Sequence, residues 1–155
     1  MAIVVSAFGV WSLATVRANR SMNALQDRDA MKPLQHVVAS KTAKFGTVDR
    51  DAAAPKNALD AHDLTGAQKL IGKEGSFRGT VSKIYEERDG DIVVLDFDPN
   101  YRTALTAVLR NADFPKFPDI RTLEGKEVVV LGKFVDYHGT AQIELTDPAQ
   151  IKLIK

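Results

Sequence analysis

The part of this chain that most constrains its fold is the segment near its end, residues 126–154. Glu127–Tyr137 is rich in β-branched and aromatic residues, His138-Gly139 follows as a turn, and Thr140–Leu145 returns as a second β-rich run. The pattern predicts two antiparallel strands joined by a tight hairpin, with Ile151–Ile154 as a short closing strand. Short strands with glycine in their turns are typical of a small β-barrel.

Three further strands are predicted upstream, over Phe77–Tyr85, Asp91–Phe97 and Thr103–Leu109. Asp89-Gly90 is a strong hairpin dipeptide between the first two, and Asp98-Pro-Asn100 ends the second. Residues 112–124 carry Ile120 and Leu123 at helical spacing. We therefore expect a short helix between the third and fourth strands.

Five short runs carry a resemblance to a known family: Phe77-Arg-Gly-Thr-Val81, Leu105-Thr-Ala-Val-Leu109, Leu123-Glu-Gly-Lys126, Val130-Leu-Gly-Lys133 and Tyr137-His-Gly-Thr-Ala-Gln-Ile143. They resemble bacterial OB-fold domains of the nucleic-acid-binding type, over about residues 62–155. The resemblance implies a mainly β, five-stranded OB-fold barrel with a short helix between strands three and four. It also implies binding of single-stranded nucleic acid across strands two and three and the neighbouring loops.

Residues 2–16 carry no charge, and Arg17 follows directly. A membrane-spanning helix needs roughly 20 apolar residues, and Trp11 at an interface with a snorkelling Arg17 would extend this run. Residues 1–18 are therefore predicted to be a membrane anchor, with a signal sequence or a helix or strand buried on the barrel as alternatives. The anchor residues are Ile3, Val4, Val5, Phe8, Val10, Trp11, Leu13, Val16 and Arg17.

Charge and hydrophobic periodicity indicate how the rest of the chain is organised. Residues 19–60 are expected to be a helical or irregular linker, because 45–60 lack periodicity, and residues 61–155 form the OB-fold domain. Arg17, Arg20 and other cations follow the apolar run and none precedes it. The positive-inside rule then favours a membrane-associated protein with a single N-terminal span and the domain on the cytoplasmic side, the extracytoplasmic side staying open.

The charge of the expected domain bears on its ligand. Residues 1–60 hold eight Lys/Arg against five Asp/Glu, whereas residues 61–155 hold 13 against 15. Proteins that bind nucleic acid usually carry a basic excess, because phosphate contacts supply most of the non-specific affinity. Nucleic acid is thus possible but not favoured by charge. The chain has no cysteine, which excludes thiolate metal sites and cysteine nucleophiles.

One motif suggests catalysis. Arg88-Asp-Gly-Asp-Ile-Val93 resembles the turn after the first strand in thermonuclease-like OB domains, which hold calcium with further carboxylates and arginines near the third strand. Here the third-strand region is Leu105-Thr-Ala-Val-Leu-Arg-Asn111, with no arginine inside the strand and no Asp-Thr-Pro-Glu run after it. The turn is therefore interpreted as structural. We expect no enzyme, with residual nuclease activity as a minor alternative.

No metal or cofactor is expected. Asp96-Phe-Asp-Pro-Asn100 resembles the start of a calcium loop, but Tyr101 stands where glycine is needed and Ala107 where the last glutamate should be. An Asx-type turn at a strand end fits better. His36, His62 and His138 are far apart in sequence and are expected to be exposed. Haem chaperones of cytochrome c maturation use a histidine after the last strands, which this chain lacks.

Surface chemistry then remains as the basis for function. Tyrosine faces and nearby cations could form a ligand or partner surface. Its candidate residues are Arg78, Lys83, Tyr85, Arg88, Tyr101, Arg102, Lys133, Tyr137 and His138. The sequence predicts a non-catalytic, membrane-tethered OB-fold interaction module, an accessory or scaffolding subunit that docks on a protein partner in a membrane-associated complex. The alternative is a single-stranded nucleic-acid-binding protein.

Overall fold

The computed structural model describes residues 39–87 and 90–155. The expected anchor at 1–18, the linker up to residue 38, and Arg88 with Asp89 lie outside these residues. Within the two described ranges, no helix is long and apolar enough to cross a membrane.

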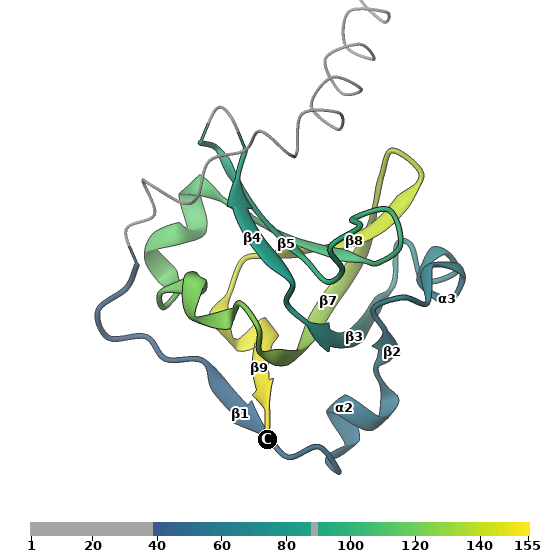
Figure 1. The fold of residues 1–155 in the computed structure, drawn as a ribbon, viewed down its shortest axis with the longest axis horizontal. Helices are drawn as coiled ribbons and strands as arrows, with labels where there is room; N and C mark the ends of the chain where they lie inside the picture. The colour runs from purple at the N-terminus through teal and green to yellow at the C-terminus, as the bar shows by residue number, and fades with distance from the viewer. Residues whose placement is uncertain (1–38, 88–89) are drawn as a thin grey trace, which may run out of the picture. The chain divides into compact units, whose positions relative to one another are not determined.

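The described part of the chain is mainly β, and nine strands form one curled sheet (Figure 1). The strands are β1 (Gly46–Val48), β2 (Leu59–Asp60), β3 (Glu74–Thr80), β4 (Lys83–Glu86), β5 (Ile92–Asp96), β6 (Thr106–Arg110), β7 (Glu127–Tyr137), β8 (Thr140–Leu145) and β9 (Ile151–Ile154). Two short α-helices, α2 (Ala53–Asn57) and α3 (Leu64–Gln68), precede β3.

The pairing order explains why the sheet curls. β3 pairs with β7, β7 with β8, β8 in parallel with β6, β6 with β5, and β5 with β4. β3 and β4 are consecutive in the chain, separated only by Val81 and Ser82. The Val81 N–H donates to the Lys126 carbonyl at 2.9 Å, and the Ser82 N–H donates to the Asp96 carbonyl at 2.8 Å. At these two residues the chain leaves β7 and joins β5, which divides the single strand predicted over Phe77–Tyr85.

The C-terminal hairpin has the predicted bounds, since β7 covers 127–137 and β8 covers 140–145. β6 begins three residues later than expected, because the Thr103 N–H closes a turn onto the Asn100 carbonyl. The predicted helix is two 3-10 helices, η2 (Asn111–Lys116) and η3 (Ile120–Leu123). Pro115 lies inside η2, and Pro118 restricts the residue before it, so a longer α-helix cannot form here.

Residues 45–60, expected as linker, contain regular structure. β1 pairs in parallel with β9, and β2 pairs in parallel with β3. Neither strand has a periodicity of its own, since they are three and two residues long. A further 3-10 helix, η4 (Pro148–Gln150), leads into β9.

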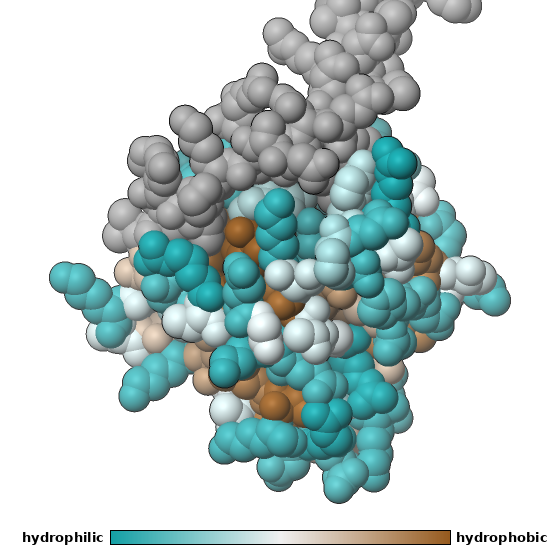
Figure 2. All heavy atoms as spheres, viewed as in Figure 1, coloured by the Kyte–Doolittle hydropathy of each residue, from teal (hydrophilic) through white to brown (hydrophobic). Residues whose placement is uncertain are grey.

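The core lies inside the curled sheet. Phe77 of β3 and Phe97 after β5 meet edge to face, with ring centroids 4.9 Å apart. Gly79 lets a neighbouring segment approach β3, because a Cβ there would stand 2.8 Å from the Ala61 Cβ. Phe114, Ile120 and Leu123 bring the 3-10 helices into the same cluster. The face seen in Figure 2 is mostly hydrophilic, with a few separate apolar areas.

Candidate interaction surface

The outer face of β4, β5 and β6 carries a row of apolar side chains. Tyr85 pairs with Val94, and Val94 pairs with Val108, so the three stand side by side. They are only 1%, 2% and 8% exposed, yet none belongs to the core cluster, which contains the alternate residues Val93 and Leu95. We call Tyr85, Val94 and Val108 the outer row.

The polar neighbours of the outer row give it a mixed character. Lys83 pairs with Asp96, and Asp96 pairs with Thr106, one step further along the same strands. The Lys83 ammonium lies 5.8 Å from the centroid of the Tyr85 ring. Asp96 is 5% exposed. The outer face of β5 and β6 therefore carries valines and a buried carboxylate. A platform on which bases stack would need aromatic rings at these positions.

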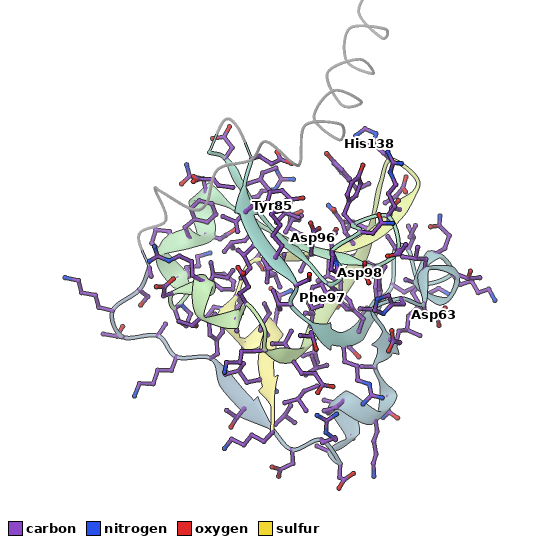
Figure 3. All side chains as sticks on the ribbon, in the orientation of Figure 1. Asp63, Tyr85, Asp96, Phe97, Asp98 and His138 are labelled. Atoms are coloured by element: carbon purple, nitrogen blue, oxygen red, sulfur yellow. The ribbon has the colours of Figure 1, made fainter. Side chains whose placement is uncertain are left out.

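The structure separates the predicted surface residues into distinct places. Lys83 and Tyr85 share β4, whereas Arg78 lies in β3 opposite Asp60 of β2. In the loop after β5, the Arg102 Nε donates to the Tyr101 hydroxyl at 3.2 Å. Lys133, Tyr137 and His138 belong to the β7–β8 hairpin, and Arg88 is outside the described residues. In Figure 3, Tyr85 lies on β4 while His138 lies at the tip of the hairpin.

The hairpin tip has a defined conformation. His138 and Gly139 have φ angles of 52° and 83°, which is the geometry of a type I′ turn. The Gly139 N–H donates to Asp136 Oδ1 at 3.0 Å, which fixes the turn. The rings of Tyr137 and His138 meet edge to face, 4.5 Å between centroids. The hairpin therefore presents a half-exposed aromatic ring and an exposed imidazole together.

An open groove with a volume of about 670 Å³ runs along the second half of β7. Its apolar lining comes from the half-buried Leu131 and Val135 and from the exposed Ala149. Glu74, Lys133 and Glu144 supply its charges. The Glu144 carboxylate is bonded to the guanidinium of Arg110. The groove thus combines an apolar lining with charges of both signs.

Gln150 fixes one wall of this groove. Its Nε2 donates to the carbonyls of Leu131 at 3.0 Å and Glu144 at 3.2 Å. Its Oε1 accepts from the N–H groups of Thr146 at 2.8 Å and Asp147 at 3.0 Å. One side chain therefore ties β7, the end of β8 and η4 together. The sequence carried a signal for it, because Asp147-Pro-Ala-Gln150 has the spacing of a capping box, which forms here.

His62 joins two carboxylates that are distant in sequence. Its Nδ1 lies 2.9 Å from Asp60 Oδ1, and its Nε2 lies 3.0 Å from Asp98 Oδ2. Hydrogen bonds to Asp98 and then Asp60 raise the pKa of His62. The hydrogen bond from the His62 ring lowers the pKa of Asp98, and the bond from the Asn100 N–H lowers it further. The pKa of Asp60 is also lowered, first by the hydrogen bond from the His62 backbone N–H.

The His62 cluster is a link between segments. The imidazole side chain is 53% exposed, as the sequence suggested, but it bridges two loops, which the sequence did not suggest. The Asn100 N–H donates to Asp98 Oδ1 at 2.7 Å, so the expected Asx-type turn forms after β5. Over residues 39–87 and 90–155, no group of three or more His, Asp or Glu is arranged to hold a metal ion.

No family model matches the chain, and no curated protein matches it. Among solved structures it is similar to a putative aspartyl-tRNA synthetase from Leishmania major Friedlin, with 13% sequence identity and a TM-score of 0.43. The match covers 84% of this chain and 25% of that chain, so this chain spans about a quarter of its length. Similarity at this level bears on neither the fold family nor the function.

Proposed function

We propose that this protein is a non-catalytic OB-fold interaction module that docks on another protein. The strand pairing supports the OB assignment: β3 with β4 acts as the first strand, followed by β5, β6, β7 and β8, and the first strand pairs with both the second and the fourth. η2 and η3 occupy the connection between the third and fourth strands. This is the connectivity expected of a five-stranded OB barrel.

The observation that carries the docking proposal is the groove along β7 together with the hairpin tip. Leu131, Val135 and Tyr137 are half-buried, so they offer apolar area to a partner at low cost in polar desolvation. Lys133 and His138 are exposed beside them. Protein interfaces of this kind combine an apolar centre with a polar rim. These five residues, Leu131, Lys133, Val135, Tyr137 and His138, define the docking surface.

The membrane tether is part of the proposal and rests on the sequence of residues 1–18 alone. With it, the partner would be a membrane-associated protein complex, and the domain would lie on the cytoplasmic side that the charge pattern favours. The docking surface does not depend on the tether. Carbonate extraction of isolated membranes tests the tether separately, because a peripheral protein is released and a spanning one is retained.

Site-specific photocrosslinking tests the docking surface in the full-length protein. A photoreactive amino acid at Val135 should give a discrete adduct with one partner in native membranes. The same amino acid at Lys56, an exposed position in α2, is the matched control and should not give that adduct. Adding Tyr137→Glu to the Val135 variant should abolish it. Absence of any adduct from the Val135 variant, or an equal adduct from the Lys56 variant, would contradict the docking proposal.

Single-stranded nucleic-acid binding is the second candidate. Tyr101 is half-buried beside the exposed Arg102, whose guanidinium carbon lies 5.4 Å from the ring centroid, and such pairs can stack on bases. Against it stand the valines of the outer row and the acidic balance of residues 61–155. Titrating the full-length protein with labelled oligonucleotides at two salt concentrations decides between them. Salt-dependent binding that Tyr101→Ala and Arg102→Ala weaken would favour nucleic acid.

A further inference from the structure

Four charged side chains form a row across the outer face of the sheet. Glu74 of β3 pairs with Lys133 of β7. Glu144 of β8 lies on the other side of Lys133, one step beyond the end of the β7–β8 ladder, and these three side chains line the same groove. The guanidinium of Arg110 in β6 is bonded to the Glu144 carboxylate. Because β3, β7, β8 and β6 are successive neighbours in the sheet, the charges alternate in sign across it. We call Glu74, Lys133, Glu144 and Arg110 the charge row.

The charge row is open to another molecule. Glu74 and Lys133 are exposed, and neither has an ion-pair partner among the described residues. Glu144 and Arg110 bind each other, yet their side chains are still 31% and 58% exposed. Charges held in a fixed order favour a partner whose charges have the complementary order. The row therefore selects a partner with alternating charges of its own.

We propose that two copies of this chain associate through the docking surface, about a two-fold axis that runs along the groove between β7 and β8. A two-fold interface uses the same surface on both sides, so that surface must be complementary to itself. An alternating row of four charges meets this condition. Rotation about an axis parallel to the strands sets Lys133 of one copy against Glu144 of the other, and Glu74 against Arg110. An axis along the row would set each charge against its own copy, so the charges select the first direction.

The apolar side chains of the groove lie beside this axis. Leu131 and Val135 belong to β7, two positions on either side of Lys133. Strands in a sheet are about 4.8 Å apart, so an axis between β7 and β8 brings the two copies of each side chain next to each other. The interface then has an apolar centre crossed by charges. Because the groove is small, we expect weak association, with a dissociation constant of about 10–100 µM.

This inference rests on the docking surface of the proposed function and adds a form of regulation to it. In the dimer, Leu131, Lys133 and Val135 are covered by the second copy. A different partner protein can then bind only by separating the two copies. Self-association and partner binding therefore compete for one surface, and dilution of the protein favours the partner.

Exchange of charges tests the inference in the full-length protein, by sedimentation equilibrium in a density-matched detergent. Lys133→Glu sets carboxylates against each other at two symmetry-related places, so the dissociation constant should rise by about ten-fold or more. Glu144→Lys should have the same effect. An equimolar mixture of the two variants should recover the association of the parent, because every charge in the row again meets the opposite sign.

Lys56→Glu is the matched control for these variants. It makes the same change of charge as Lys133→Glu at an exposed position in α2, outside the charge row, and should leave the dissociation constant unchanged. A parent that stays monomeric at about 1 mM would contradict the inference. So would association that Lys133→Glu does not weaken, or a mixture that does not recover.

A further variant covers the case in which Glu144→Lys fails to fold without its bond to Arg110, which a lowered melting temperature would report. Val135→Asp then decides, because it places two carboxylates side by side at the axis. Its dissociation constant must rise by about ten-fold or more, and unchanged association overturns the inference.

The photocrosslink from Val135 separates this inference from the proposed function. An adduct with the mass of two chains identifies the second copy, and any other adduct identifies a different protein. An adduct with a different protein, without self-association, overturns this inference and leaves the docking proposal standing. An adduct between two copies alone supports this inference and contradicts docking on a different protein.

Discussion

Gln150 lies so close to Gly132 that a Cβ at position 132 would stand 2.7 Å from Gln150 Nε2. The same Cβ would stand 2.9 Å from Ile143 Cγ2, and Gly132 has a φ angle of +152°. The missing side chain is what allows the Gln150 amide to reach the Leu131 carbonyl. Glycine at 132 and glutamine at 150 therefore form one structural unit between β7 and η4.

Gly132→Ala should lower the free energy of unfolding by about 2–4 kcal/mol, through overpacking and an unfavourable backbone conformation. Urea denaturation of the full-length protein measures it. Gly46→Ala is the matched control, because its Cβ would meet Lys152 Cγ at 3.6 Å, an ordinary contact. Gly46→Ala should change the free energy of unfolding by no more than about 1 kcal/mol. Similar losses from both variants would contradict the close approach at Gly132.

Gln150→Ala should lower the free energy of unfolding by about 2–4 kcal/mol. The change leaves two backbone N–H groups and two carbonyls without this partner in a partly buried place. Gln150→Glu tests which half of the amide matters. A carboxylate keeps the acceptor for Thr146 and Asp147 but faces the carbonyls of Leu131 and Glu144 without a donor. Gln150→Glu should therefore lower the free energy of unfolding more near neutral pH than near pH 4, where the new carboxyl group is partly protonated and can donate. A loss that does not vary with pH would exclude the donor role.

Local sequence patterns predicted the strands that pair with near neighbours. β7, its turn and β8 have the bounds expected from their β-branched runs and from His138-Gly139. β1 and β2 could not be predicted, because two or three residues carry no periodicity and their partners, β9 and β3, are specified only by the folded sheet. The break between β3 and β4 likewise depends on a change of partner that leaves no mark in Phe77–Tyr85.

The interaction surface was harder to predict from the sequence than the sheet. The identity of an aromatic or cationic residue does not show which face of a strand it occupies. Tyr85 was expected to offer a stacking face, and its ring is 1% exposed. The continuous apolar runs around Val94 and Val108 were the available signal that these side chains are buried. His62 and Asp98 are 36 residues apart, and only the loop after β5 brings them together.

His62→Gln should destabilise the protein most under mildly acidic conditions. The folded pKa of His62 is raised, so its contribution is fully present below the unfolded value of about 6.5 and is lost as pH rises through the folded pKa. The pKa values of Asp60 and Asp98 are lowered, so their contributions are present above about 3.9 and are lost as pH falls through their folded pKa values. The difference in melting temperature from the parent should peak between about pH 4 and 6.5.

Thermal melts across pH 3 to 9 provide the measurement for His62→Gln, roughly the range over which these groups titrate. His138→Asn is the control, because it removes an imidazole from the β7–β8 turn, and asparagine tolerates the positive φ angle there. The control shows how far the loss of an imidazole outside the Asp60–His62–Asp98 cluster alters the melts. A difference for His62→Gln that grows above pH 7 would show that the imidazole does not act as a shared cation between Asp60 and Asp98.

β1 should be part of the folded domain, and truncation can measure how much it contributes. Phe45 packs against the core, the Lys155 N–H donates to the Val48 carbonyl at 2.9 Å, and Arg50 binds both carboxylate oxygens of Glu127. A chain that starts at residue 52 should therefore be about 2–4 kcal/mol less stable than one that starts at residue 39, from lost apolar burial and an exposed β9 edge. Urea denaturation of the two chains measures this directly. Equal midpoints would mean that β1 lies on β9 without stabilising the sheet, whereas a lower midpoint places the start of the domain before residue 46.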